Sequence, residues 1–119
     1  MLNIHQNLMV YLITGTTDMR KSINGLSLIV SEQLDGNPFD GSLFVFCNKG
    51  RDKLKILHWQ HNGFWLYYRR LENGKFQWPK NKPDENNMVL SLRELHWLLD
   101  GLSLFQRQAH PSVSGLKNN

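Results

Sequence analysis

The pattern of apolar and polar positions along the chain separates short strand-like runs from longer helical stripes. Continuous apolar runs at 9–13 and 43–47 predict strands, because turn-forming residues follow each of them. Between these runs, apolar residues recur at three- and four-residue steps over 19–34, which predicts one amphipathic helix. The stretch 35–41 is dense in Asp, Gly, Asn and Pro and is therefore expected to end that helix.

The middle of the chain carries the clearest hairpin signals. Alternating runs at 53–60 and 64–71 flank Asn62-Gly63, and an Asn-Gly pair is the strongest short-range signal for a hairpin turn. A second pair, Asn73-Gly74, precedes a last apolar run at 76–79. Together with the run at 43–47, these segments predict an antiparallel meander of four strands.

A second helix is predicted over 90–102, where Ser91 and Glu94 have the spacing of a capping box ahead of a leucine stripe. The elements together indicate an α+β fold that forms a single domain over 1–105. We expect an antiparallel β-meander of about four to five strands with two main helices packed on one face. Residues 106–119 are polar and are expected to form a mobile C-terminal tail.

The two Asn-Gly pairs also predict the register and the faces of the sheet. As two-residue loops they place Trp59 opposite Leu66 and Lys55 opposite Arg70. Side chains alternate, so two faces result. The face expected under the helices is apolar and carries Leu54, Ile56, His58, Trp65, Tyr67, Leu71, Phe76 and Trp78, joined by Phe44 and Phe46. The opposite face mixes cations with apolar groups and carries Lys53, Lys55, Leu57, Trp59, Leu66, Tyr68, Arg70, Lys75 and Gln77.

Composition narrows the class of protein. A length of 119 residues suits one domain, and a net charge of +4 with a pI near 9.4 permits a polyanionic partner without requiring one. The single cysteine, Cys47, excludes an internal disulfide. The N-terminal apolar run lacks a charged leader, and no apolar run approaches the roughly 20 residues that span a bilayer. We expect a cytoplasmic protein with no membrane partner.

Two clusters of cations are candidates for binding phosphate. Arg20 and Lys21 follow Thr16-Thr17-Asp18 and fall in the first turn of the predicted helix, where the helix dipole disfavours positive charge. Three interpretations stay open: Asp18 pairs with Arg20, both cations contact carboxylates elsewhere in the fold, or the cations join the free N–H groups of the helix start in a phosphate-binding corner. The turn 48–53 supplies the second cluster of cations.

These clusters and the mixed sheet face define a candidate nucleic-acid-binding surface. Cations would meet phosphates and flat rings would stack on bases. The candidate residues are Arg20, Lys21, Lys49, Arg51, Lys53, Lys55 and Arg70, with Trp59 and Tyr68 as stacking platforms. Two alternatives stay open at this point. The face is simply solvated, or Leu57, Trp59, Leu66 and Tyr68 form an exposed patch that docks a protein partner.

No catalytic or metal-binding pattern emerges from the sequence. Its carboxylates are scattered, whereas a two-metal nuclease needs several that converge. Five histidines without repeated spacing and one cysteine make a poor zinc site. Cys47 lies in a strand-like run without an identifiable base, which favours a buried structural thiol. We therefore expect no catalytic residue, no metal, no cofactor and no enzymatic activity.

Three segments resemble, in order, the small accessory protein of the IS66 family of bacterial insertion sequences. They are TDMRKSINGL at 17–26, the stretch 41–79 and LSLRELHWLLDGL at 90–102. The resemblance spans residues 10–104, and the blocks 18–21, 51–53 and 62–68 match the family pattern. Gln60 and Asn24 depart from it, and because both departures remove negative charge they favour a polyanionic partner.

The resemblance implies a role in transposition rather than a reaction. Elements of this kind encode a separate transposase with an acidic catalytic triad and two small accessory proteins, and no catalytic residue carries over to this chain. We expect an accessory factor that contacts DNA, at the element ends or non-specifically, through the basic and aromatic surface. The alternative is a module that docks the transposase or the second accessory protein without touching DNA. Whether the chain forms a homo-oligomer is left open.

Overall fold

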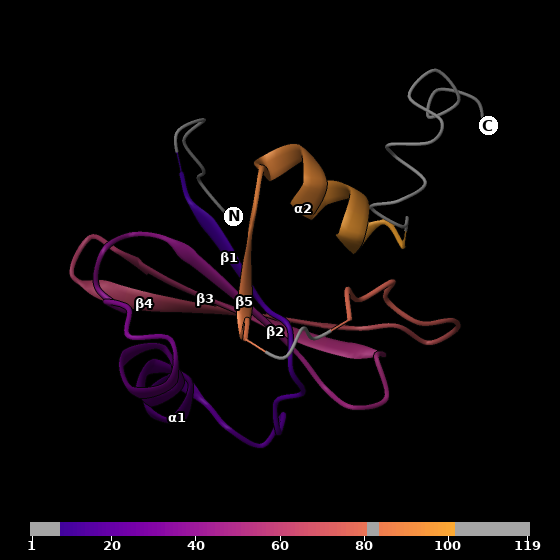
Figure 1. The fold of residues 1–119 in the computed structure, drawn as a ribbon, viewed down its shortest axis with the longest axis horizontal. Coiled ribbons are helices and arrows are strands. Elements are labelled where there is room, and N and C mark those ends of the chain that lie inside the picture. The colour runs from indigo at the N-terminus through magenta and orange to yellow at the C-terminus, as the bar shows by residue number, and fades with distance from the viewer. Residues whose placement is uncertain (1–7, 81–83, 102–119) are drawn as a thin grey trace.

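The computed structural model describes residues 8–80 and 84–101, and Figure 1 labels its elements. The tail and the domain boundary predicted near residue 105 lie outside these residues. The strands are β1 (Val10–Ile13), β2 (Leu43–Cys47), β3 (Lys53–Gln60), β4 (Gly63–Arg70) and β5 (Asn87–Leu90). The helices are α1 (Ile23–Leu28), continued by a π-helical turn η1 (Ile29–Gln33), and α2 (Leu92–Leu99).

The five strands form one mixed sheet in the order β4-β3-β2-β1-β5, which confirms an α+β fold. Strands β2, β3 and β4 are an antiparallel meander, but β1 pairs parallel to β2 and antiparallel to β5. The predicted fourth strand at 76–79 was wrong. The Phe76 N–H donates to the carbonyl oxygen of Arg51 (2.7 Å) in the β2–β3 turn, and the Phe76 ring fills the core. Strand β5 was not predicted, because it has only four residues and directly precedes the second predicted helix.

The two helices lie on opposite faces of the sheet, so the prediction that both pack on one face was wrong (Figure 1). Parallel strands need a crossover connection, and here α1 and η1 make the crossover from β1 to β2. Helix α1 therefore covers one face, while α2 covers the other. Strand β2, in the middle, is buried along its whole length because both faces are covered.

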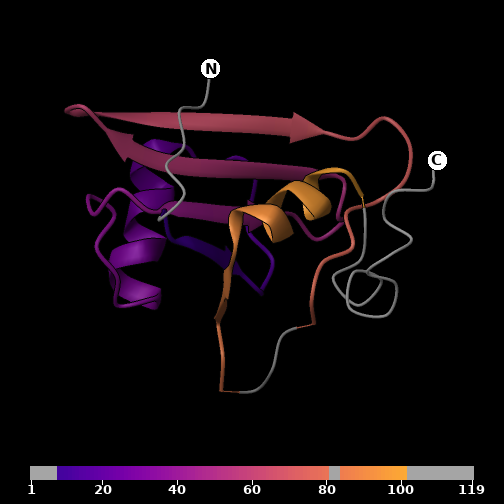
Figure 2. The ribbon, with the colours of Figure 1, turned by 90° about the horizontal axis from the view of Figure 1, so that it is seen from above.

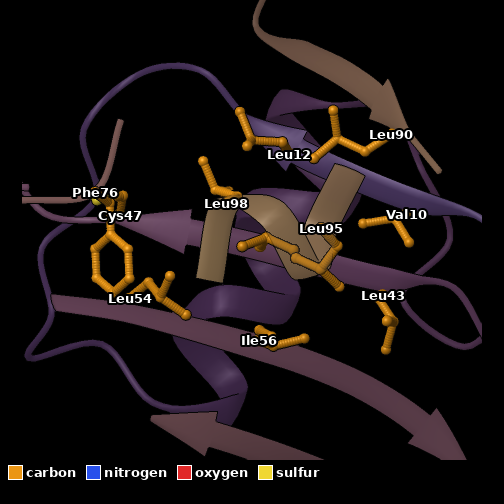
Figure 3. Close-up of a cluster of buried hydrophobic side chains, with 11 residues drawn as sticks. Val10, Leu12, Leu43, Cys47, Leu54, Ile56, Phe76, Leu90, Leu95 and Leu98 are labelled. Atoms are coloured by element: carbon orange, nitrogen blue, oxygen red, sulfur yellow. The ribbon is translucent and has the colours of Figure 1, made fainter. Parts of the chain in front are cut away.

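Each face of the sheet has its own core. Below α2 lies a cluster that includes Leu95 and Leu98 of the helix together with Val10, Leu43 and Ile56 of the strands (Figure 3). The second core lies under α1 and η1. It is formed by Ile13, Leu26, Ile29, Val30, Phe44, Phe46 and Leu57. Phe44 and Phe46 thus belong to the α1 face, opposite to the prediction, because Phe44 pairs with Leu57 and Phe46 with Lys55 across the β2–β3 ladder.

The β3–β4 hairpin turns one residue earlier than predicted. His61 and Asn62 have positive φ values of 52° and 67° and form the two-residue loop, so Gln60 pairs with Gly63. Trp59 therefore faces Phe64 rather than Leu66, and Lys53 rather than Lys55 faces Arg70. The pairing shifts by two residues, so every side chain of β3 and β4 stays on its predicted face.

The helix starts differ in how well they were predicted. Helix α2 begins after Ser91, whose side chain accepts from the Glu94 N–H while Glu94 caps the Ser91 N–H, which confirms the capping box. Helix α1 begins only at Ile23, four residues later than predicted, so Arg20 and Lys21 precede the helix. No helix in the described part of the chain has the length and apolar character required to cross a membrane.

Candidate nucleic-acid interface

Three segments distant in sequence surround one open hollow on the α1 side of the sheet. We call it the basic hollow; it has a volume of about 600 Å³. Its lining residues are Thr16, Thr17, Asp18, Met19 and Arg20 from the loop after β1, Asn48, Lys49 and Gly50 from the β2–β3 turn with Lys53 from the start of β3, and Tyr68 from β4. Four of the nine candidate residues, Arg20, Lys49, Lys53 and Tyr68, therefore meet at one place.

The β2–β3 turn holds its cations on a hydrogen-bonded frame. The side-chain oxygen of Asn48 accepts from the N–H groups of Asp52 and Lys53 (both 3.1 Å), and its amide donates to the Asp52 carboxylate (2.8 Å). Arg51 adopts a positive φ of 62°, which lets the chain reverse within this frame. Lys49 is consequently presented to solvent at the rim of the hollow.

Lys55 anchors the loop that follows β1, which forms one side of the hollow, to the sheet. Its ammonium donates to the carbonyl oxygens of Met19 (2.7 Å) and Lys21 (2.8 Å), and it lies 5.9 Å from the centre of the Tyr68 ring. The Thr17 N–H donates to the carbonyl oxygen of Cys47 (2.8 Å) and anchors the same loop to β2. The charge predicted to meet phosphate at Lys55 is therefore used to position the loop that carries Arg20.

Three cations of the candidate set are paired with carboxylates. Arg20 contacts Asp18 (2.6 Å), Arg70 contacts Glu72 (2.9 Å) and Lys53 contacts Asp52 (3.4 Å). The hydrogen bonds from Arg20 lower the pKa of the Asp18 carboxyl to about 2, so this pair is intact at neutral pH. The local pairing of Asp18 with Arg20 is thus confirmed. Arg20 and Lys21 do not lie in the first turn of a helix as predicted, because α1 begins only at Ile23.

The remaining cations divide into exposed and inward-facing groups. Lys21 and Lys49 are exposed, and within residues 8–80 and 84–101 neither makes an ion pair. Arg51 is half-buried and does not line the hollow; its Nη1 is buried without a hydrogen-bond partner among the described residues.

The cysteine next to Arg51 holds its proton. Burial raises the pKa of the neighbouring Cys47 thiol to about 11, although the charge of Arg51 opposes this shift. Cys47 is buried, as the sequence indicated.

Trp59 lies away from the basic hollow, at the other end of β3. It is half-buried and makes edge-to-face contacts with Phe39 and Phe64, both at 4.9 Å between ring centres. Leu57 is fully buried under α1, so the exposed patch predicted from Leu57, Trp59, Leu66 and Tyr68 does not exist as one surface. Exposed apolar area lies instead at Leu28 and Phe39, which are 54% and 55% exposed and line a neighbouring groove.

Some residues of these surfaces were not singled out from the sequence. Asn48 frames the basic hollow, and its spacing to Asp52 across a Gly-containing turn is a signal for such side-chain capping. The sequence gave no signal for the contact of Thr17 with β2, because that contact joins segments far apart in the chain. Among the residues described, no group of His, Cys, Asp or Glu side chains is arranged to hold a metal ion.

The fold and the hollow define a small mixed-sheet protein with an open cationic surface. The chain belongs to the IS66 Orf2 like protein family, whose model matches residues 8–109. It is 38% identical over 102 residues to the uncharacterized protein y4hO of Sinorhizobium fredii, covering 86% of this chain and 87% of that one. It is also 32% identical to the uncharacterized protein y4jC of the same organism, with 86% of each chain covered. No solved structure matches it.

Membership in this family identifies the chain as an accessory protein of a bacterial insertion sequence. This family of accessory proteins is not a known catalytic family. The resemblance noted in the sequence is therefore confirmed at the level of the family.

Proposed function

We propose that this accessory protein assists transposition by holding DNA through phosphate contacts in the basic hollow. The observation that supports this most is the convergence of three cations on one open surface: Arg20 from the loop after β1, Lys49 from the β2–β3 turn and Lys53 from the start of β3. Lys21 and Arg70 would extend the same positive surface. This role places the protein with the bacterial chromosome in the cytoplasm.

The ion pairs around the hollow do not prevent such binding. Arg20 has 91% of its side chain exposed, and water screens the attraction within an exposed ion pair, so a phosphate can share or displace the carboxylate. Lys49 is exposed and available without breaking a pair. The ring of Tyr68 is 52% exposed beside these cations and offers a flat surface to a sugar or an unpaired base.

A salt series with a matched pair of variants tests this proposal. Fluorescence anisotropy would follow a labelled duplex carrying an element end, and a scrambled duplex of the same length, at two or more salt concentrations. Lys49→Gln is expected to weaken binding to both duplexes and to reduce the salt slope by roughly 0.9, the value for one lost phosphate contact. Arg93→Gln removes one exposed charge from α2, on the opposite face, and is expected to leave binding unchanged.

The outcome is decisive in either direction. Equal losses from Lys49→Gln and Arg93→Gln would mean that only net charge matters and that the hollow is no site. Absence of wild-type binding at low salt would reject DNA contact altogether.

A second candidate function is docking to the transposase or to the other accessory protein of the element. The groove beside α1 favours it, because the groove has a volume of about 610 Å³ and is lined by the exposed apolar side chains of Leu28 and Phe39. Phe39→Ser is expected to abolish co-purification with the transposase from cells that express all the proteins of the element. Capture that survives nuclease digestion and high salt in the wild type but not in this variant would favour docking over DNA tethering.

A further inference from the structure

Strand β4 is a long and open edge of the sheet. It is an edge strand of the sheet, whose order is β4-β3-β2-β1-β5, and it runs for eight residues. No described segment pairs with its outer side, and Figure 2 shows β4 at the border of the sheet with β3 on one side only. The opposite edge, β5, is only four residues long. The sheet therefore offers one extended row of backbone groups for further pairing.

The register identifies which backbone groups face outward. The Leu71 N–H donates to the carbonyl oxygen of Asp52, and the His61-Asn62 loop makes Gln60 and Gly63 the closing pair of the hairpin. Hydrogen-bonded pairs alternate along an antiparallel ladder, so odd-numbered residues of β4 bond to β3. The N–H and C=O groups of Phe64, Leu66 and Tyr68 consequently point away from the sheet.

Apart from the two arginines at its end, this edge lacks the features that normally keep sheet edges apart. Monomeric proteins protect an edge with proline, lysine, bulges or very short strands. Strand β4 instead carries five consecutive apolar or aromatic residues, 64–68, without proline or charge. Two of its rings, Trp65 and Tyr68, are 46% and 52% exposed on opposite faces of the sheet. Such an edge fits a partner that supplies another strand with matching aromatic side chains.

We propose that the partner is a second copy of this chain, paired antiparallel through β4 with Leu66 opposite Leu66 of the partner subunit. In this register the outward-facing N–H and C=O groups of one copy hydrogen-bond to those of the other. It also places Phe64 opposite Tyr68 of the partner subunit and Trp65 opposite Tyr67 of the partner subunit, so aromatic residues meet on both faces. A two-fold pairing is closed, because it uses the same edge of both copies and leaves only the short β5 edges free.

Charge selects the antiparallel arrangement. The strand ends in Arg69 and Arg70, which the proposed register places next to uncharged Gly63 and Asn62 of the partner subunit. A parallel pairing would set the arginines of the two copies side by side, and like charges in that position repel.

The dimer would also place the two basic hollows together. Because the two-fold axis is perpendicular to the sheet, both basic hollows would lie on the same face of the joined sheet. Dimerisation itself does not depend on DNA binding.

The first experiment measures the mass of the purified full-length chain, without DNA, by size-exclusion chromatography with light scattering over a range of concentrations. Tyr68→Pro removes an outward N–H while sparing the β3–β4 ladder, and Tyr68→Thr removes the same ring but keeps the N–H. The wild type is expected to be dimeric, and the proline variant is expected to have a dimer Kd at least about tenfold higher than the threonine variant. A monomeric wild type at roughly 100 μM, or a dimer that Tyr68→Pro leaves intact, would overturn the proposal.

The second experiment does not depend on the folding of the proline variant. Cys47 is buried, so mild oxidation reports on introduced cysteines only. Leu66→Cys is expected to form a reducible disulfide dimer, because facing residues in an antiparallel pair lie about 5.5 Å apart between Cα atoms. Arg69→Cys, on the same strand but far from its own copy in this register, is expected to stay monomeric. No cross-link at position 66, or equal cross-linking at both positions, would reject the pairing.

Discussion

At the scale of single residues, charge in this protein serves the fold as much as the surface. Lys55 lies on a strand among apolar neighbours, and its ammonium bonds two backbone carbonyls of the loop at 19–21. Lys53, one step along the same face, makes only a partly exposed ion pair with Asp52. Identical side chains two residues apart therefore have different physical roles.

Replacing each of these lysines by methionine separates the two roles. Lys55→Met is expected to lower the free energy of unfolding by about 1–3 kcal/mol, because two charge-assisted hydrogen bonds are lost. Lys53→Met is expected to cost less than about 1 kcal/mol, as for other exposed pairs. Urea denaturation measures both values. A smaller loss for Lys55→Met than for Lys53→Met would mean that the ammonium of Lys55 does not hold the loop.

Cys47 predicts a specific dependence of stability on pH. Burial raises its pKa from 9.0 to about 11, so the unfolded chain releases this proton at lower pH than the folded chain. The contribution of Cys47 is therefore complete below about pH 9 and is lost as the pH rises to about 11. Urea unfolding across this pH range is expected to show a steeper loss for the wild type than for Cys47→Ala. Parallel curves would contradict a proton held by burial.

At the scale of elements, short segments depend on their ends and on the face they bury. Helix α2 has eight residues, and isolated helices of that length are marginal in water. Its capping box satisfies N–H groups at the start, while Leu95 and Leu98 enter the core below it. The helix is therefore stabilised by one local signal and by one tertiary contact.

Two substitutions measure these contributions separately. Ser91→Ala is expected to lower the free energy of unfolding by about 1 kcal/mol through loss of the cap. Leu95→Ala is expected to lower it by about 2–5 kcal/mol, because Leu95 is buried in the core below α2 and its truncation leaves a cavity there. Thermal denaturation monitored by circular dichroism checks both. If Ser91→Ala proved the more damaging of the two, packing below α2 would not be the main source of its stability.

At the scale of the whole molecule, the sheet is most protected in its middle. Strand β2 has hydrogen-bonded neighbours on both sides and helices over both faces, whereas β5 has, among the described residues, a neighbouring strand on one side only. Native-state hydrogen exchange is expected to be slowest for the amides of β2 and much faster for those of β5. Equal protection of the two strands would mean that the domain opens only as one global unit.

The local predictions succeeded where neighbouring residues carry the information. The capping box, the strands at 43–47 and 53–60, the faces of the hairpin and the pairing of Asp18 with Arg20 depend on residues a few positions apart. The exact hairpin loop was missed by one residue, because Asn62-Gly63 allows the turn to centre on either side of Asn62. The buried state of Cys47 was also predicted, since an apolar run surrounds it.

The sequence alone determined the type of most elements, the family and the presence of clustered cations, since each is a local pattern of side chains. Only the tertiary structure decided that the helices lie on opposite faces, that β5 joins β1, and which cations meet at the basic hollow. These features depend on which distant segments pack together. A stripe of apolar residues indicates that one face of an element must be buried. It does not indicate which other element will cover that face, because this depends on which packing of the whole chain buries the most apolar surface.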